Sequence, residues 1–589
     1  MKLSFPAVVA ILVVAAFLMS GAASMLTYGD EPSSLKTFRS KNDLMNFLNT
    51  HRPNDGGGVP LFGPVLSDAE NAAAPARDHS KTNTQVAGVD EGDIVKTDGE
   101  HIFISDGTAV HIIRADPSGA LSNVSTIRPA DPSSWCQISD LYLDNGTLVV
   151  VYSCSEQNVS PGPAYDAIYL PVEQRTVVAA YDVSDASDPH LAYQAGVDGW
   201  PVSTRMVGGT VYAVVQHYIW DRGAPDLPEV QDGNGSAEVK SSEVLYDPSV
   251  PEVSSFVNLL AVDVRGHGCD CLTVLSGTSS VVYMSPFSLY ITMEKWPTTW
   301  MSSERTGDIT TTVYRIAVDG LDMELAAQGE VDGRPINQFA LDEKDGLLRI
   351  ATTSWMTQNN TVSVLDRDLQ EIGRLSGIAP GETIYSCRFL GDLLYLVTFL
   401  QVDPLFIIDL SQPSEPAVLG ELKVPGVSTY LQMTEHGLLG IGFENGSLKV
   451  SLFDVTDPSF PREIDTYTAP GHSYSEAQWN HHAVLYDERH GLLSLPVSGW
   501  EHAAEGSYWS YRAWSATAVL SVSSDGLELR GTIEHQNASM LRSLYIDDLL
   551  YTVSTTTVKV NRLPDLGPVS SLVYREEDPY RYAYVGMEK

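Results

Sequence analysis

The stretch FLGDLLYLVTFLQVDPLFIIDLSQPSEPAVLGELKVPGVSTYL (Phe389–Leu431) contains the two patterns that decide the fold. The first is a Gly or Asp followed by an apolar run, here at residues 393–396, which predicts a strand. The second is the template D-[VL]-[ST]-x-x-S-x-P at residues 409–416. It ends a strand and begins a turn, because proline cannot donate a hydrogen bond to a sheet.

Both patterns recur along the chain. Leu-Leu pairs begin the apolar runs at residues 347, 393, 438, 492 and 549, and these are spaced 46, 45, 54 and 57 residues apart. Earlier runs of the same kind begin at His101, Thr147, Thr210 and Ser288. The Asp–Pro template recurs at residues 182–189 and 454–461. A period near 45 residues, with about four strands in each unit, is typical of a β-propeller blade.

These repeats predict an all-β protein, a β-propeller of four-stranded antiparallel blades. Nine strand cues lie between residues 100 and 550. Because propellers usually have four to eight blades, we predict eight blades and one cue outside the ring, with nine blades as the alternative. A β-helix or a set of β-sandwiches fits less well, since the period is too long for the first and too regular for the second.

The N-terminal region differs from the repeats. An apolar run at residues 5–19 follows Lys2 and precedes small residues, which is typical of a secretory signal, with an uncleaved membrane anchor as the alternative. We assign residues 1–25 to this segment. Residues 26–82 are expected to form a short helix within residues 33–50 and a flexible linker. The propeller is assigned to residues 83–577 and a tail to residues 578–589.

Composition restricts the classes of partner. Apolar residues make up 43% of the 589 residues, which excludes global disorder. The chain has 75 acidic and 36 basic residues, a formal charge of −39. Such a field repels nucleic acid and anionic lipid, so both are excluded as general partners. An acidic, soluble surface fits a protein outside the cell.

Glycosylation sequons and cysteines also point to export. Seven N-x-S/T sequons are candidate glycan sites: Asn123, Asn145, Asn158, Asn234, Asn359, Asn445 and Asn537. Cys136 and Cys154 flank a turn at residues 144–147 almost symmetrically, so we predict a disulfide across a hairpin. A strict two-residue turn leaves them one position out of register, so the hairpin needs a β-bulge. One of the five cysteines has no partner within the chain.

Three segments also resemble a known family. The sequence TNTQVAGVDEGDIVKTDGEHIFI (Thr82–Ile104), the Phe389–Leu431 stretch and NHHAVLYDERHGLLSLPV (Asn480–Val497) are similar to signatures of secreted, cell-surface β-propellers of archaea and bacteria. This family is distantly related to WD-repeat proteins. The chain departs from its pattern at Leu400, where Arg is expected, and at residues 432–433, where His-Pro is expected. The resemblance implies the fold and export, and it assigns no catalytic residue.

A cluster of acidic residues is the candidate metal site. Four carboxylates lie within nine residues at the entry to the first blade, and they are Asp90, Glu91, Asp93 and Asp98. Carboxylate oxygens are ligands that Ca²⁺ prefers, so Ca²⁺ is the cofactor predicted. The alternative is a solvated acidic turn whose carboxylates accept backbone N–H groups.

Histidines form a second group, His481 and His482 with His472 and His490. If His481 and His482 lie in a strand, they point to opposite faces and do not easily share one metal. We therefore expect one of them to line the channel and the other to pack.

An aromatic insertion is the candidate ligand site. It contains Trp500, Tyr508, Trp509, Tyr511 and Trp514. Such rings can stack on sugars or hold an extended peptide. The alternative is that they cover the edge of a blade.

The favoured function is that of a non-enzymatic binding or scaffold propeller at the cell surface, secreted or anchored, which recognises an envelope protein or glycan. The sequence lacks the standard catalytic motifs, so no catalytic residue is assigned. One alternative is a polysaccharide hydrolase or lyase that uses a carboxylate pair such as Asp342 with Glu343, or Glu501 with Glu505. Another is a structural component of a surface layer.

Overall fold

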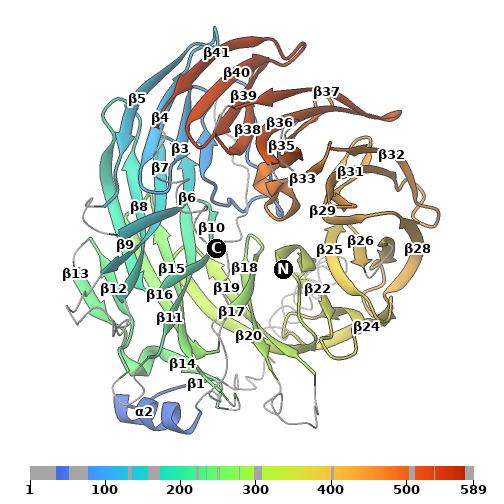
Figure 1. Ribbon diagram of the computed structural model, residues 1–589. Helices are drawn as coiled ribbons and strands as arrows, with labels where there is room; N and C mark the ends of the chain where they lie inside the picture. The colour runs from blue at the N-terminus through green and yellow to red at the C-terminus, as the bar shows by residue number, and fades with distance from the viewer. Residues whose placement is uncertain are drawn as a thin grey trace, which may run out of the picture.

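A ring of nine sheets forms the body of the protein. The computed structural model describes residues 35–51, 77–130, 135–156, 173–220, 225–233, 235–248, 250, 252–277, 279–296, 308–399, 403–502, 511–535 and 538–576. Within these residues the strands form nine sheets around a common centre (Figure 1). The protein is therefore an all-β propeller with nine blades. Nine is the alternative count that the sequence analysis kept open beside the predicted eight. Each of the nine strand cues lies at the start of the second strand of a blade.

Blade 1 has four strands, whereas blades 2 and 3 have six each. Blade 1 is β2 (Val95–Thr97), β3 (His101–Ser105), β4 (Val110–Ala115) and β5 (Leu121–Ile127). Blade 2 is β6 (Trp135–Asp144), β7 (Thr147–Glu156), β8 (Glu173–Asp182) and β9 (His190–Asp198), extended by β12 (Glu229–Asp232) and β13 (Gly235–Glu238). Blade 3 is β10 (Trp200–Val207), β11 (Thr210–Tyr218), β15 (Ser255–Asp263) and β16 (Gly268–Ser276), extended by β14 (Val244–Tyr246) and β1 (Lys36–Thr37).

Blades 4 to 6 have four strands each. Blade 4 is β17 (Ser279–Met284), β18 (Ser288–Lys295), β19 (Thr310–Asp319) and β20 (Asp322–Asp332). Blade 5 is β21 (Leu341–Lys344), β22 (Leu347–Thr353), β23 (Asn360–Leu365) and β24 (Glu371–Ile378). Blade 6 is β25 (Thr383–Leu390), β26 (Leu393–Phe399), β27 (Asp403–Asp409) and β28 (Ala417–Val424).

Blades 7 to 9 complete the ring. Blade 7 is β29 (Val427–Thr434), β30 (Gly437–Glu444), β31 (Ser447–Asp454) and β32 (Arg462–Thr468). Blade 8 is β33 (His472–Tyr474), β35 (Leu492–His502), β36 (Tyr511–Ser523) and β37 (Gly526–Glu534), and β34 (Leu485–Asp487) also pairs with β35. Blade 9 is β38 (Met540–Ile546), β39 (Leu549–Ser554), β40 (Thr557–Arg562) and β41 (Pro568–Val573).

Burial explains the sequence pattern within each blade. The second and third strands, such as β30 and β31, are buried along most of their length because neighbouring blades cover both faces. The fourth strand, such as β32, lies at the rim, where polar residues alternate with half-buried ones. In the Asp–Pro turns, the Asp454 carboxylate accepts the amide hydrogen of Thr456 at 3.0 Å. The Asp182 and Asp409 carboxylates accept equivalent bonds.

The predicted disulfide and bulge are both present in blade 2. Cys136 of β6 and Cys154 of β7 lie directly opposite each other and form a disulfide. A register shift between Ile138 and Asp140 supplies the extra residue that the hairpin requires. The same irregularity occurs in the innermost strand of blade 3, between Pro201 and Ser203. The bulge therefore recurs between blades, and in blade 2 it aligns Cys136 with Cys154.

The ring closes by packing between its first and last blades, which exchange no strand. Ile104 of blade 1 and Tyr551 of blade 9 belong to one buried cluster. The Ser570 hydroxyl also donates to the Gly119 carbonyl across this junction. Figure 1 shows the blue first blade beside the red last blade.

Residues 78–93, here called the central plug, run through the middle of the ring. The Ser80 amide donates to the Tyr545 carbonyl of blade 9 at 2.9 Å. The Asn83 side chain donates to the Tyr430 hydroxyl of blade 7 at 2.9 Å and to the His481 carbonyl of blade 8 at 3.1 Å. The plug thus ties together blades that lie apart in the sequence.

The rest of the plug reaches the other side of the ring. Gln85 donates to the Leu341 carbonyl of blade 5 at 3.0 Å. Asp90 exchanges two backbone hydrogen bonds of 2.6 Å with Met206 of blade 3. Gly92 lies so close to blade 2 that a Cβ atom there would be 2.4 Å from the Asp140 Cβ. This plug contains the start of the long signature near the N-terminus, which explains why the signature is long.

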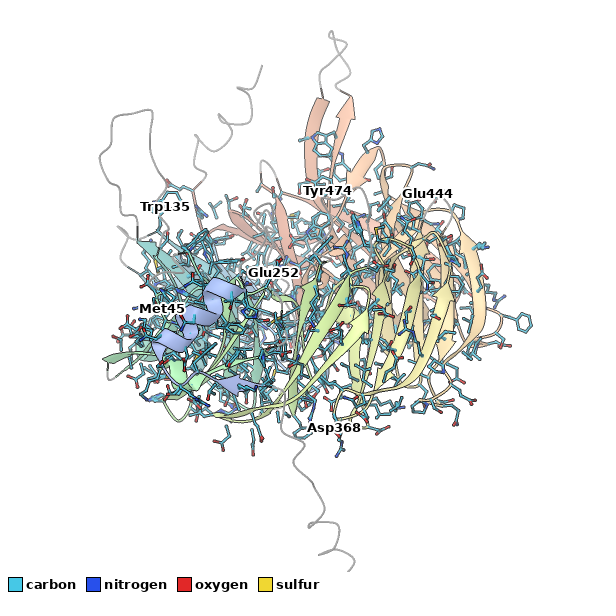
Figure 2. The ribbon with its side chains drawn as sticks, turned by 90° about the horizontal axis from the view of Figure 1, so that it is seen from below. Met45, Trp135, Glu252, Asp368, Glu444 and Tyr474 are labelled. Carbon is cyan, nitrogen blue, oxygen red and sulfur yellow. A yellow bond between two sulfur atoms is a disulfide. The ribbon has the colours of Figure 1, made fainter. Side chains whose placement is uncertain are left out.

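Two faces of the ring are distinguished by their loops. The loops between second and third strands, and between successive blades, emerge on one face, here called the upper face. It carries Tyr474 and Glu444 at the top of Figure 2, whereas Asp368, in a turn between third and fourth strands, lies at the bottom. The hairpin of β35 and β36 rises above the upper face (Figure 2).

The predicted N-terminal helix is present and packs on the ring. Helix α2 (Lys41–Thr50) begins at Ser40, whose hydroxyl accepts the Asp43 amide hydrogen. Leu44 and Leu48 are fully buried against blade 3, and Phe38 stacks on Tyr246 at 3.9 Å between ring centroids. The predicted signal, residues 52–76 of the predicted linker and the C-terminal tail lie outside the described residues, whereas residues 78–82 of that linker belong to the central plug. Of the helices within the described ranges, none is long and apolar enough to span a membrane.

The insertion between β11 and β15 covers edges of blades 2 and 3. The sequence of residues 220–251 is polar and rich in Gly, Asp and Pro, which by itself predicts a loop that rises from a blade face. Instead, β12 pairs with β9 of blade 2, and β14 pairs with β16 of blade 3. Pairing satisfies the backbone groups that an outer edge strand leaves exposed, which is the physical reason for this placement.

Candidate functional site

The centre of the ring holds a buried cluster of charged side chains. Arg542 of β38 donates through Nε to both Asp93 carboxylate oxygens at 2.9 and 3.0 Å, and through Nη1 to Glu476 at 2.9 Å. Lys96 of β2 donates to the Asp90 carboxylate at 3.1 Å and to the Glu91 carbonyl at 2.7 Å. These bonds connect the plug to blades 1, 8 and 9.

Two further arginines approach the plug from blades 3 and 6. Arg205 of β10 donates to the Gln338 side chain at 3.3 Å, and its Nε lies 3.9 Å from the Glu91 carboxylate. Arg388 of β25 donates to the Thr84 carbonyl at 3.3 Å and lies over the Phe339 ring at 5.0 Å from its centroid. Arginines from blades 3, 6 and 9 therefore converge on the plug.

Glu91, His481 and His482 meet inside this cluster. Their candidate ligand atoms all lie within 4.8 Å of one another, and all three residues are buried. Glu91 belongs to the plug, and the two histidines belong to the short 3₁₀ turn η4 (His481–Ala483) of blade 8. The Asn480 side chain caps this turn by accepting the His482 amide hydrogen at 3.1 Å.

This geometry overturns the expectation that the two histidines point apart. That expectation assumed a strand, in which successive side chains alternate between faces. In the 3₁₀ turn the two rings lie side by side instead, with centroids 4.2 Å apart. The other two histidines of the predicted group are elsewhere, since His472 is exposed on β33 and His490 binds Asp487 at 2.7 Å.

Burial sets the protonation of this site. It raises the pKa of the Glu91 carboxyl, and the positive charges of Arg205 and Lys96 oppose this. Burial also lowers the pKa of His481 well below its usual range, and Arg388 and Arg205 add to that effect. His481 is therefore neutral at ordinary pH, the form in which a histidine nitrogen binds a metal.

The four predicted acidic ligands do not converge on one point. Asp90 binds Lys96 and Asp93 binds Arg542, whereas Asp98 accepts the backbone amides of Glu100 and His101 in the turn after β2. Only Glu91 of these four belongs to the metal-ligating group found among the described residues. Calcium binding by the four carboxylates stays a prediction.

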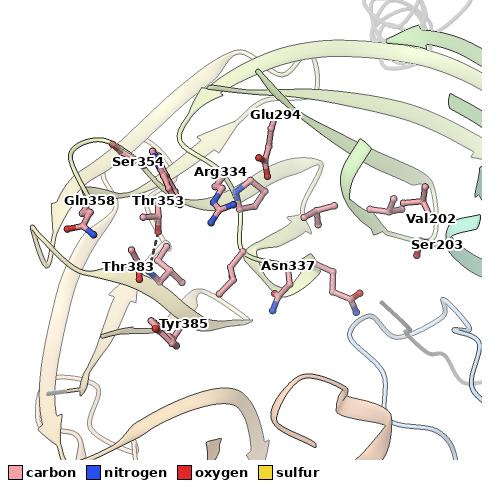
Figure 3. A pocket seen from close by; sticks show the side chains of 17 residues that line it. Val202, Ser203, Glu294, Arg334, Asn337, Thr353, Ser354, Gln358, Thr383 and Tyr385 are labelled. Atoms are coloured by element: carbon pink, nitrogen blue, oxygen red, sulfur yellow. Dashed lines mark hydrogen bonds between the residues drawn. The ribbon is translucent and has the colours of Figure 1, made fainter. Parts of the chain in front are cut away.

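A cavity opens on the upper face, above the plug. It has a volume of 490 Å³ and lies between the loops of blades 3 to 6 (Figure 3). Arg334 and Glu294 project into it, and Asn337, Gln358 and Tyr385 line its wall. Its size is in the range of small-molecule and oligomer sites in proteins.

Trp355 is the main aromatic side chain of this cavity, and it is 51% exposed. The Arg334 guanidinium lies 5.2 Å from the centroid of its ring, and Trp296 packs edge-on at 6.0 Å. The Asp308 carboxylate accepts the Trp355 amide hydrogen at 3.1 Å and so fixes the loop. Trp355 was not predicted from the sequence. The only feature that marks it there is its position in a short polar connection between strands.

A second aromatic surface lies on blade 8, on the same face. Tyr474, Trp479 and Trp500, here called the aromatic row, are 40%, 68% and 48% exposed. The Tyr474 ring centroid lies 6.2 Å from that of Trp479 and 5.5 Å from that of Trp500. Tyr474 lies on the upper face in Figure 2, and the two tryptophan rings lie beside it.

The predicted aromatic insertion is only partly described. Trp500 belongs to the aromatic row, while Trp514 turns inward and packs against the core of blades 7 and 8. Tyr511 begins β36, and nothing further is described of its side chain. Tyr508 and Trp509 lie outside the described residues. Both interpretations of the insertion therefore have support, because one ring is exposed and another covers a blade.

Of the two carboxylate pairs in the enzymatic alternative, the structure describes the side chains of Asp342 and Glu343, and these do not face each other. Asp342 and Glu343 are neighbours in β21, so they point to opposite faces. Asp342 binds Arg349, and Glu343 accepts the Ser285 hydroxyl at 2.6 Å. Glu501 lies in β35, where its side chain is not described, and Glu505 lies outside the described residues.

Two of the sequons occupy tight turns that suit a projecting glycan. Asn145 and Asn445 are exposed, with φ of 47° and 51°, conformations that asparagine tolerates. Asn123 is exposed on β5, and Asn359 is half-buried before β23. Asn158, Asn234 and Asn537 lie outside the described residues. Glycosylation stays a prediction at all seven.

Fold and site together define a nine-bladed β-propeller whose channel is filled by its own N-terminal segment. The chain belongs to the family described as Beta propeller domain, whose model matches residues 79–566. That match begins at the plug, which is thus part of the family's domain.

Two archaeal proteins are similar over nearly their whole length. An uncharacterised protein of Archaeoglobus fulgidus is 28% identical, with 94% of this chain and 97% of that protein covered. An uncharacterised protein of Methanocaldococcus jannaschii is 27% identical, with coverage of 94% and 93%. Among solved structures, a computationally designed protein, Ika8, has a TM-score of 0.35 at 12% identity and covers 72% of this chain and 95% of its own. A periplasmic gluconolactonase of Pseudomonas aeruginosa has a TM-score of 0.31 at 10% identity, with coverage of 54% and 91%.

Proposed function

We propose that this chain is an exported, non-enzymatic propeller that binds a glycan of the cell envelope on its upper face. The observation that supports this best is the 490 Å³ cavity with Trp355 at its side. A pyranose ring has apolar C–H faces and a polar rim of hydroxyl groups. An aromatic plane and surrounding amide, hydroxyl and charged side chains are complementary to both.

The aromatic row extends this surface for a longer ligand. Tyr474, Trp479 and Trp500 are large, stiff and exposed. Tyr474 lies on the same face as the cavity, and the two tryptophan rings lie beside it. Exposed aromatic groups of this kind usually mark a binding site, since a soluble surface otherwise avoids them. A chain of sugar units with one end in the cavity would meet a second set of rings there.

Export is the second part of this proposal. The apolar run at residues 5–19 and the seven sequons support it. The Cys136–Cys154 disulfide supports it as well, because such bonds persist in oxidising compartments. The tests are fractionation of cells, sequencing of the mature N-terminus, and a mass shift after glycan removal. Retention of the unmodified full chain in the cytoplasm would contradict export.

Binding is tested with the full-length protein on a panel of envelope oligosaccharides, followed by calorimetry. We expect saturable binding that Trp355→Ala weakens by at least about tenfold, since aromatic anchors dominate such sites. Phe460→Ala is the matched control, because Phe460 is also an exposed aromatic residue but lies in a turn between β31 and β32 on the lower face. Equal loss in both variants, or no saturable binding, would overturn the proposal.

The same assay separates the alternatives. Release of new reducing ends or unsaturated products from a bound glycan would indicate a hydrolase or lyase. Binding of an envelope protein without any glycan would favour a protein partner, and ordered self-assembly of the purified chain would favour a surface-layer role.

A further inference from the structure

The cluster of Glu91, His481 and His482 has the composition of a transition-metal site. Two histidines and one carboxylate are a common ligand set for zinc and for related divalent metals. Among the residues that the structure describes, these three form the one group of three or more histidine, cysteine or acidic side chains whose ligand atoms lie within 4.8 Å of one another. The site is distinct from the glycan cavity, since none of the three lines that cavity.

The spacing within the cluster fits a shared ion better than a direct hydrogen bond. The Glu91 Oε2 and His481 Nε2 atoms lie 3.8 Å apart, beyond hydrogen-bonding distance. Two ligands at about 2.0–2.2 Å from one tetrahedral zinc ion stand roughly 3.3–3.6 Å from each other. The observed 3.8 Å is about 0.2 Å longer than that, so a small movement of either side chain would bring both atoms onto one ion.

These two atoms also lack any other partner. Glu91 Oε2 and His481 Nε2 are both buried without a hydrogen bond. Burying a polar atom without a partner costs free energy, so such atoms are rare and require an explanation. They belong to residues whose candidate ligand atoms all lie within 4.8 Å of one another, so one ion could contact both.

Most of the charges around the site are paired. Arg542 is compensated by Asp93 and Glu476, and Lys96 by Asp90. Arg205 Nε lies 3.9 Å from the Glu91 carboxylate, and Arg388 binds the Thr84 carbonyl nearby. The positive charges of these two arginines oppose a bound cation. The carboxylate of Glu91 and that of the buried Asp140 next to the plug offset them.

We propose that Glu91, His481 and His482 bind one divalent transition metal of the zinc class. Glu91 comes from the plug and the histidines from blade 8, so the ion would fasten the plug to the ring. The metal would be structural, because it joins two segments that are far apart in the chain. Its binding is expected to stabilise the folded state, since the unfolded chain cannot assemble the ligands.

The test uses the full-length protein and measures metal content by elemental mass spectrometry. After loading with Zn²⁺ and dialysis, we expect about one equivalent for the native chain. Glu91→Gln and His481→Gln should each lose most of it. His535→Gln is the matched control, because His535 is also buried but lies in the connection between blades 8 and 9, where it contacts Thr552. It should retain the full equivalent.

A second measurement keeps the proposal testable if a variant fails to fold. Co²⁺ added to the metal-free native chain should produce visible absorption typical of a low-coordinate nitrogen and oxygen site, and Zn²⁺ should abolish it. Zn²⁺ should also raise the thermal midpoint by a few degrees. Binding well below one equivalent without a Co²⁺ spectrum, or equal content in Glu91→Gln, would overturn the proposal. A response to Ca²⁺ alone would overturn it in favour of the acidic residues.

Discussion

At the scale of single residues, Arg542 joins three parts of the molecule. It lies on β38, it binds both oxygens of Asp93 in the plug, and it binds Glu476 of blade 8. Arg542 and Asp93 are each 3% exposed. A buried pair of this kind costs desolvation when it forms, but removing one partner costs more, because the other charge is left buried alone.

We expect Arg542→Met to destabilise the protein by about 3–5 kcal/mol, as measured by chemical and thermal unfolding. Arg462→Met is the matched control, since Arg462 binds Asp454 in the same way but is 75% exposed. A surface pair contributes at most about 1 kcal/mol. Equal losses in the two variants would show that burial of the Arg542 pair is unimportant.

His535 provides a prediction on pH. Burial, with a contribution from Lys559, lowers its pKa to about 4, whereas an unfolded histidine titrates near 6.5. Between these values the unfolded state binds more protons, so this residue's contribution to stability falls as pH falls from about 6.5 to 4. His535→Gln, which can keep the bond to Thr552, should reduce the loss of stability over that window. An unchanged pH profile of unfolding would contradict this.

At the scale of elements, the β-bulge in the hairpin of β6 and β7 determines which residues lie opposite each other, and so allows the disulfide to form. The bulge between Ile138 and Asp140 shifts the register by one residue and places Cys136 opposite Cys154. The sequence predicted both features, because the turn and the two cysteines lie within one short segment. Cys269, Cys271 and Cys387 remain as thiols.

We therefore expect three reactive thiols in the denatured, unreduced protein and five after reduction. Replacing Cys136 and Cys154 together by serine should lower stability by about 3 kcal/mol, because the bond closes a loop over a sequence separation of 18. Serine at Cys269 and Cys271 is the control. Five thiols before reduction would rule out the disulfide.

The conformation of His481–Ala483 differs from the strand that the sequence suggested. The sequence suggested a strand, in which the two histidines diverge, but Asn480 caps a 3₁₀ turn that brings them together. Only the packing of this turn against the plug selects that conformation. The position of Glu91 was also predicted incorrectly. The sequence grouped it with its acidic neighbours, whereas in the structure it lies beside His481 and His482.

At the scale of the whole molecule, the central plug is the segment that contacts many blades at once and belongs to none of the nine sheets. It bonds to blades on all sides, from Tyr545 of blade 9 to Leu141 of blade 2. The first and last blades exchange no strand, so the ring relies on side-chain packing and on the plug for closure. Removing the plug would leave Arg388 and Arg542 without their partners in it.

This gives a prediction from two truncations. Deleting residues 1–76 removes α2 but keeps the plug, and we expect a folded ring with a modestly lower thermal midpoint. Deleting residues 1–94 removes the plug as well, and we expect loss of cooperative unfolding or a far lower midpoint. Circular dichroism and calorimetry on both proteins make the comparison. Equal midpoints would show that the plug contributes nothing to closure.

The sequence by itself determined the repeat, the strands and the local turns. A period near 45 residues, apolar runs such as the one at Leu393, and the turn at Asp409 are local features, so burial and backbone hydrogen bonding fix them within a blade. The tertiary structure alone decided the number of blades, the path of the plug and the meeting of Glu91 with His481. These depend on closing a ring between segments far apart in the chain, and no local pattern encodes such a distance.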